Sequence, residues 1–241
     1  MNPLVLTSMA AASTSVGGCC AVLLQRRTNL LMAFGAGVLV GAASFDLLPA
    51  SASAAARSGH LVLLIVPFSA LGGLLAFAVA AAAARYSARG AESRAAGRFS
   101  ASLLVLHSMT DGTAIFAAST ISLKLGLLVG MGVVAHDVCD GLNTILLSSC
   151  GRKTQWTDYG FLALDALAPI AGGLIAGHWF NIAPLFVMIV LSFAAGSFLF
   201  AAVFQLFPGA WRRGSRNLLP WLGLVGFSLM FCLTRMLGLL G

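Results

Sequence analysis

The chain has 241 residues, of which 59% are hydrophobic and only 9% are charged. A soluble domain carries about 25% charged residues, so this composition excludes a water-soluble globular protein and indicates an integral membrane protein. The net charge of +7 does not indicate a nucleic-acid partner. The basic residues form short clusters between apolar runs, which is the pattern of membrane topology.

Eight apolar runs follow one another along the chain, each long enough to cross a bilayer, which takes about 20 residues. We therefore predict a single all-α transmembrane domain over 1–241, with eight spans joined by short connections. The longest connection, 85–98, is basic and contains Gly, Ala and Ser, so it is predicted to be a flexible cytoplasmic loop between the third and fourth spans. The predicted spans are 3–24, 30–50, 60–84, 99–119, 123–149, 158–178, 183–206 and 217–239.

The distribution of Lys and Arg predicts the orientation of these spans. Eleven of the 14 basic residues lie in loops after odd-numbered spans, and the remaining three lie on the opposite side. Basic loops face the cytoplasm, so both termini are expected outside it. The eleven are Arg26, Arg27, Arg85, Arg89, Arg94, Arg98, Arg152, Lys153, Arg212, Arg213 and Arg216, and the three are Arg57, Lys124 and Arg235.

Five aspartates lie inside the apolar runs. Each one costs about 2.5–3.5 kcal/mol in the middle of a span unless it is paired or solvated. Lys and Arg are nearly absent from the spans, so clustered carboxylates there indicate a bound metal, protons or water. The five are Asp46, Asp111, Asp137, Asp140 and Asp165.

Two neighbouring spans repeat one pattern: His-Ser-Met-Thr-Asp-Gly at 107–112 and His-Asp-Val-Cys-Asp-Gly at 136–141. In both, His and Asp are four residues apart and so share one helix face. Imidazole nitrogen and carboxylate oxygen suit Zn²⁺ and related divalent ions. Polar contacts between helices would use the same residue types, but two such units in adjacent spans favour a metal or proton pathway. The candidate ligands are His107, Asp111, His136 and Asp140, with Ser108 and Asp137 at a neighbouring position.

These two motifs resemble the His-Asn-x-Pro-Glu-Gly and His-Glu-x-Pro-Glu-Gly motifs in the fourth and fifth spans of ZIP (Zrt/Irt-like) metal transporters. Other segments are similar too: Ser-Phe-Asp-Leu-Leu-Pro at 44–49 resembles the second span, closest to the bacterial GufA-like branch. Leu-Ala-Pro at 167–169 resembles the sixth span, and Ala-Ala-Gly-Ser-Phe at 194–198 the seventh.

The resemblance implies an eight-helix bundle with a binuclear metal centre between spans four and five. It implies uptake of a divalent transition metal, zinc foremost, by an elevator-like shift of spans one, four, five and six. Its motif positions make His107, Asp111, His136 and Asp140 the main ligands, assign Ser108 and Asp137 to the second metal, and place Asp46 on the route from span two.

The sequence departs from the family pattern at several site positions. Both motif Glu residues are Asp, and the motif prolines are replaced by Thr110 and Cys139. Ala168 stands where a metal-bridging Glu often precedes the proline of span six, and Asp165, three residues earlier on nearly the same face, is the candidate substitute. The metal is therefore left open among Zn²⁺, Cd²⁺, Fe²⁺ and Mn²⁺.

Two other functions use buried His and Asp. An intramembrane zinc hydrolase of the ceramidase type needs three protein ligands and an activated water, typically with a further His-x-x-x-His that this chain lacks. A proton carrier would need no metal. We predict a transporter and not an enzyme, with the metal as substrate and no cofactor, in a bacterial inner membrane; a homodimer is compatible with this prediction.

Metal binding by His needs the neutral imidazole. An unperturbed His titrates at about 6.5, so acidification to about pH 5 is expected to weaken uptake.

Overall fold

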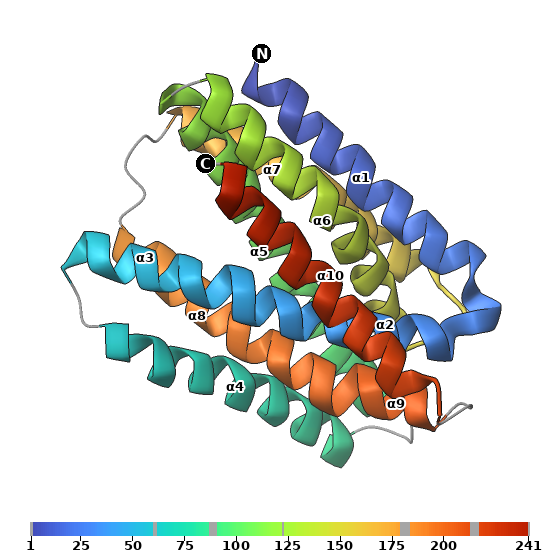
Figure 1. Ribbon diagram of the computed structural model, residues 1–241. Coiled ribbons are helices and arrows are strands. Elements are labelled where there is room, and N and C mark those ends of the chain that lie inside the picture. The colour runs from blue at the N-terminus through green and yellow to red at the C-terminus, as the bar shows by residue number, and fades with distance from the viewer. Residues whose placement is uncertain are drawn as a thin grey trace.

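A computed structural model describes residues 2–59, 62–86, 91–121, 123–178, 184–212 and 217–240. Within these ranges the chain is a bundle of long helices without β-strands (Figure 1). The helices are α1 (Pro3–Leu23), α2 (Thr28–Ala42), α3 (Leu48–Ser58), α4 (Ile65–Tyr86), α5 (Ala91–Ile121), α6 (Leu123–Ser149), α7 (Trp156–His178), α8 (Pro184–Phe200), α9 (Phe207–Trp211) and α10 (Leu219–Leu240).

Two pairs of consecutive helices are joined by a π-helical turn that is followed by a proline. Ala43–Leu47 joins α2 to α3, and Ala201–Leu206 joins α8 to α9. Pro49 and Pro208 are the second residues of the next helices, where the missing proline N–H removes one bond of the helical ladder. Such π turns are frequent at functional sites, and the first of them carries Asp46.

Seven helical segments of the described residues are long and apolar enough to cross a membrane. They correspond to the predicted spans except 123–149, which forms the long helix α6 but lies outside this set of seven. α6 is also the helix that carries His136, Asp137 and Asp140. The prediction of an all-α, multi-pass membrane protein is confirmed; the count of eight and the orientation of the termini stay predictions.

The loop predicted at 85–98 is shorter than expected. Helix α4 extends to Tyr86 and helix α5 already begins at Ala91, so the loop prediction is wrong for 85–86 and 91–98; residues 87–90 lie outside the described ranges. The segment contains several alanines, which favour helix. Arg98 also donates a hydrogen bond of 2.8 Å to the Thr157 hydroxyl of α7, which holds this end of α5 against its neighbour.

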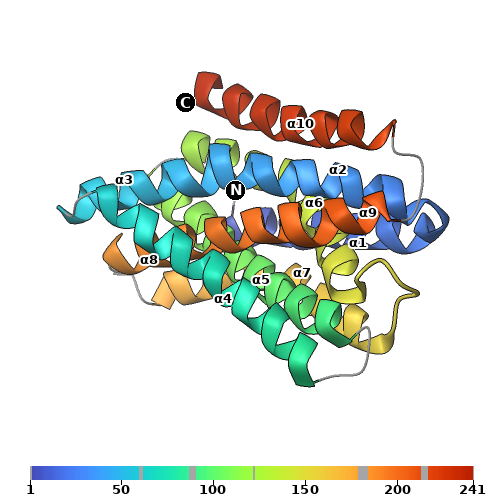
Figure 2. The ribbon, with the colours of Figure 1, turned by 90° about the horizontal axis from the view of Figure 1, so that it is seen from below.

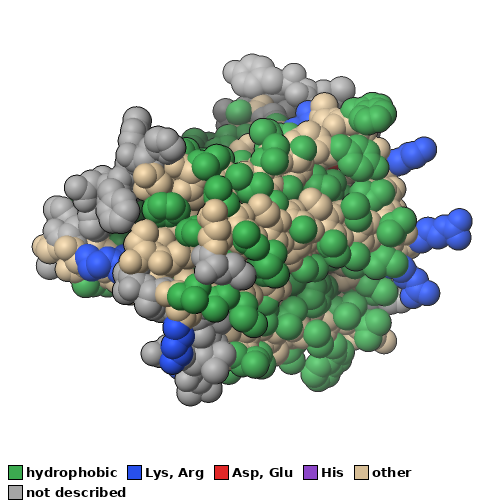
Figure 3. Space-filling model, turned by 90° about the horizontal axis from the view of Figure 1, so that it is seen from above, with side chains coloured by type: hydrophobic (Ala, Val, Ile, Leu, Met, Phe, Trp, Pro, Cys, Tyr) green, Lys and Arg blue, Asp and Glu red, His purple; other side chains and the backbone are tan. Residues whose placement is uncertain are grey.

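The surface of the bundle is apolar, as lipid requires. Phe77, Phe186 and Trp221 are among the large side chains that point outward, each more than half exposed. In Figure 3 hydrophobic side chains cover the face that is shown, and Lys and Arg project at its two ends.

Four helix pairs approach so closely that only glycine fits at the contact. A Cβ on Gly17 of α1 would lie 1.8 Å from the Val138 carbonyl oxygen of α6, and a Cβ on Gly141 would lie 1.8 Å from the Thr14 carbonyl oxygen of α1. Such backbone contact is how membrane helices pack without a hydrophobic driving force. The same reciprocal pattern joins α5 to α7 (Gly112 on Pro169, Gly172 on Met109), α2 to α10 (Gly37 on Gly223, Gly226 on Phe34) and α4 to α8 (Gly72 on Phe193, Gly196 on Ser69).

We group the described helices into two units according to which helices pack together most extensively, although α4 of the second unit also packs against α5 of the first. The first, which we call the motif unit, contains α1, α5, α6 and α7, and the second, the frame unit, contains α2, α3, α4, α8, α9 and α10. Figure 1 shows α1, α6 and α7 on one side and α3, α8 and α4 on the other, and Figure 2 shows α10 lying along α2. All four reciprocal glycine pairs lie inside one unit or the other, and none crosses the boundary between them.

Candidate metal centre

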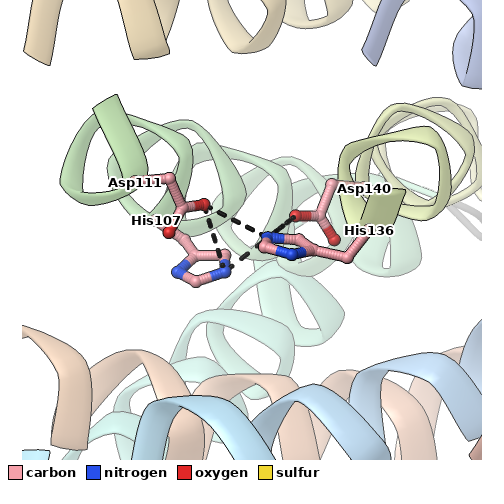
Figure 4. Close-up of side chains that lie close together, drawn as sticks. All are labelled: His107, Asp111, His136 and Asp140. Carbon is pink, nitrogen blue, oxygen red and sulfur yellow. Dashed lines mark hydrogen bonds and ion pairs between the residues drawn. The ribbon is translucent and has the colours of Figure 1, made fainter. Parts of the chain in front are cut away.

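The two His-x-x-x-Asp motifs converge on one point at the boundary between the units. His107 and Asp111 project from α5, His136 and Asp140 project from α6, and the four side chains point toward one another (Figure 4). One ligand atom from each lies within 4.8 Å of the others. His107, Asp111 and Asp140 are buried, with 3%, 8% and 2% of their surfaces exposed.

The distances suit atoms that share one cation. Asp111 Oδ2 lies 3.5 Å from His107 Nε2 and 3.4 Å from His136 Nε2. Ligand atoms about 2.0–2.1 Å from a tetrahedral zinc are separated by about 3.3–3.4 Å. Asp140 Oδ2 is slightly farther away, 4.0 Å from His107 Nε2 and 3.9 Å from His136 Nε2. A small closing of the four groups would therefore complete a tetrahedral site.

The imidazoles are arranged to leave their metal-binding atoms available. Nδ1 of His136 lies 3.1 Å from the Gly132 carbonyl oxygen, a contact that fixes the ring and directs Nε2 into the cluster, as in most His–metal sites. Among the described residues, neither ring nitrogen of His107 has a hydrogen-bond partner, nor does Asp140 Oδ2. Buried polar atoms without partners are costly, and a cation would satisfy them.

Two further acids flank the four-residue cluster. Asp46, on the π turn of the frame unit, places Oδ2 3.6 Å from His107 Nε2. Asp137 Oδ1 lies 3.6 Å from His136 Nε2, and its Oδ2 accepts a hydrogen bond of 3.3 Å from the Thr14 hydroxyl. The cluster thus has one acidic neighbour from each unit.

Ser108 and Asp165 contact each other rather than the cluster. Asp165 accepts hydrogen bonds from the Ser108 hydroxyl at 2.7 Å and from the Thr144 hydroxyl at 2.6 Å. Both carboxylate oxygens are therefore engaged, and they join α5, α6 and α7. Ala168, at the position of the missing Glu, is buried nearby on α7.

A cavity of about 190 Å³ reaches the cluster from one end of the bundle. Asp46, Asp111 and His136 form its polar wall, and its outer part lies where α5 and α10 end and α6 begins. A second cavity of about 240 Å³ lies at the opposite end, which we call the basic end because Arg212 lines it. Met32, Leu146 and Gln205 also line this second cavity. Of these two cavities, which both lie among the described residues, only the first contains residues of the cluster.

Three polar residues near the site were not predicted from the sequence. Thr14 and Thr144 donate to the aspartates, and Asn143 is fully buried on α6. The available signal was spacing, because Asn143 and Thr144 lie three and four residues after Asp140 and so share its side of the helix.

Comparisons with known proteins find similarity to zinc transporters. No protein-family model matches the chain. Human zinc transporter SLC39A7 is 31% identical over 165 residues, which cover 60% of this chain and 33% of that protein. Zinc transporter ZupT of Shigella dysenteriae is 26% identical over 258 aligned positions, which cover 98% of this chain and 99% of that protein. The chain is a relative of the ZIP transporters. It spans about a third of the length of the SLC39A7 proteins that it matches.

The relationship to ZIP proteins confirms the resemblance seen in the motifs. It also confirms that the chain is not an enzyme, because these relatives are transporters. The GufA-like branch within the ZIP family stays a prediction.

Proposed function

We propose that this ZIP relative carries divalent transition-metal cations, zinc foremost, across a bacterial inner membrane into the cytoplasm. The observation that carries the proposal is the convergence of His107, Asp111, His136 and Asp140 within 4.8 Å at the boundary of the two units. Two imidazoles and two carboxylates are a ligand set that Zn²⁺ accepts, and Cd²⁺, Fe²⁺ and Mn²⁺ are alternatives.

In this proposal the remaining candidates have different roles. Asp46 and Asp137 attract the hydrated cation and replace its water as it enters the cluster, since each lies 3.6 Å from a ligand imidazole. A second metal at Ser108 and Asp165 would require the hydrogen bond between them to open. One tightly held metal is therefore the favoured stoichiometry.

The transport step is proposed to be an elevator-like slide of the motif unit along the frame unit. The reciprocal glycine contacts hold helices together inside each unit, and their absence across the described boundary leaves that boundary free to shift. Movement of α5 and α6 would carry the cluster away from the 190 Å³ cavity toward the basic end.

Uptake into proteoliposomes tests the proposal. The purified chain should accumulate Zn²⁺ inside the vesicles, and His107→Ala or Asp111→Ala should lower the rate at least about tenfold, since even groups that only support a ligand give 10–100-fold effects. Ser102→Ala, an exposed serine on the same helix, is the control and should leave uptake unchanged.

Two results would count against the proposal. Zn²⁺ uptake that persists in both cluster variants would remove this site from the pathway. Proton flux without any metal flux in the wild-type chain would favour the proton carrier instead.

A further inference from the structure

Asn143 is a fully buried polar side chain on the far side of the cluster from the open cavity. It has no exposed surface, and neither its amide nitrogen nor its amide oxygen has a hydrogen-bond partner among the described residues. An unpaired carboxamide in a membrane protein costs free energy without adding stability, which points to a function other than packing.

Its position along α6 lies between the cluster and the basic-end cavity. Asp140 is three residues before it, on the same helix face. Leu146 and Leu147, three and four residues after it, line the basic-end cavity. A cation that leaves Asp140 toward that cavity along this face of α6 therefore meets the Asn143 carboxamide first.

Asn143 also lies at the boundary of the two units. Its Oδ1 faces Gly35 of α2 in the frame unit, where a Cβ would lie only 2.1 Å from this oxygen. The other close glycine contacts of the described residues join helices of the same unit. Among the described glycines, only Gly35 leaves room for a polar side chain of the other unit.

Leu142 and Leu146, close to Asn143 on α6, belong to a hydrophobic core cluster to which both units contribute. Leu39 of α2, Leu104 of α5 and Phe198 of α8 are fully buried in the core, and the Phe198 ring lies 5.8 Å from the His107 ring. These apolar side chains offer no ligand to a cation on its way to the basic end, whereas Asn143 offers an oxygen; we call them the apolar layer.

We propose that Asn143 is a transit ligand: its carboxamide oxygen receives the divalent cation as it leaves Asp140 for the basic-end cavity. The proposal rests on the transport function proposed above. A neutral amide oxygen replaces one water of hydration but holds a cation more weakly than a carboxylate does, so it lowers the barrier in the apolar layer without trapping the ion.

A pair of variants with the same shape tests the role of this oxygen. Asn143→Thr keeps a side-chain oxygen, whereas Asn143→Val has a methyl group in its place. We expect the Val variant to lower Zn²⁺ uptake into proteoliposomes about tenfold and the Thr variant to stay within about threefold of the wild type, since one oxygen contact is at stake. Ser148→Ala, which removes another fully buried polar group of α6, should leave uptake unchanged.

Equilibrium Zn²⁺ binding in detergent separates transit from binding. Both variants should bind Zn²⁺ at the cluster with the wild-type affinity, because Asn143 is not among the four converging ligands. Equal uptake by the Val and Thr variants, or an equal loss of binding and uptake in the Val variant, would overturn the transit role. Absence of uptake by the wild-type chain would instead refute the transport function.

Asn143→Leu and Asn143→Asp supply a second comparison if the first pair inserts poorly. Leu removes the oxygen and fills the same space, and should lower uptake as Val does. The Asp variant adds a negative charge at position 143 and should hold the cation more tightly there. Its uptake should therefore saturate at a lower Zn²⁺ concentration than wild-type uptake. A Leu variant with wild-type uptake would contradict the proposal.

Discussion

At the scale of single residues, Asp165 differs most from its expected role. The sequence suggested it as a substitute for a metal-bridging Glu, but both its oxygens accept hydrogen bonds, from Ser108 and from Thr144. Buried carboxylates that are satisfied in this way fix the positions of their donors. Asp165 therefore holds α5, α6 and α7 in register around the cluster.

Substitution of Asp165 should affect stability more than metal affinity. Asp165→Ala leaves two hydroxyls without their acceptor and should lower the free energy of unfolding by about 1–3 kcal/mol, measured as an earlier thermal transition in detergent. Asp165→Asn retains one acceptor and should lie between Ala and wild type. Loss of Zn²⁺ binding in the Ala variant without a change in stability would make Asp165 a ligand.

At the scale of helices, the glycine that ends each metal motif has a packing role. Gly112 lies against the Pro169 carbonyl oxygen of α7, and Gly141 lies against the Thr14 carbonyl oxygen of α1. Each motif thus combines ligands on one side of its helix with a close helix contact beside them. The contact sets the distance of the ligand helix from its neighbour within the motif unit.

Alanine at Gly141 should therefore destabilise the protein, whereas alanine at Gly160 should not. A Cβ at Gly141 would lie 1.8 Å from a backbone oxygen, but a Cβ at Gly160 has no neighbour within 4 Å. We expect a loss of about 1–3 kcal/mol for Gly141→Ala, the usual cost of overpacking, and little change for Gly160→Ala in helix α7. Equal thermal transitions for the two variants would show that α1 and α6 can separate without cost.

At the scale of the whole molecule, the cluster is accessible from one end. The 190 Å³ cavity contains Asp111 and His136, while the basic-end cavity lies beyond Asn143. The positive-inside distribution predicts that the open end faces away from the cytoplasm. With that predicted orientation and the proposed function, the structure would correspond to the state that accepts the cation from outside.

Cysteine labelling can test this arrangement. In a variant whose five native cysteines are replaced, Ala114→Cys in the open cavity should react with a membrane-impermeant thiol reagent added to the outer face, and Zn²⁺ should slow the reaction. Ala96→Cys at the basic end should react from the other face only. Labelling of both positions from one face would contradict the placement of the two cavities at opposite ends of the bundle.

The sequence was sufficient to predict the helices and the His and Asp pairs that converge in the structure, because hydropathy and the four-residue spacing are local properties. His107 and Asp111 share a face whatever the neighbouring helices do. The hydrogen-bond donors to Asp165 and the contact of Asn143 with Gly35 could not be predicted in this way, since they depend on how separate helices pack against one another. The early start of α5 at Ala91 falls in a segment whose Gly, Ser and Arg residues indicate a loop, whereas its alanines favour helix.

The ligand set has an electrical consequence. Asp111 and Asp140, when ionised, would balance a divalent cation between two neutral imidazoles, so in the proposed slide the loaded cluster would cross the membrane field with little net charge. The empty cluster of four residues would carry two negative charges, and each is worth about 2.3 kcal/mol per 100 mV. A potential that is negative inside should then favour return of the empty unit to the outer side. Voltage would accelerate the reset of each cycle rather than the delivery of the metal.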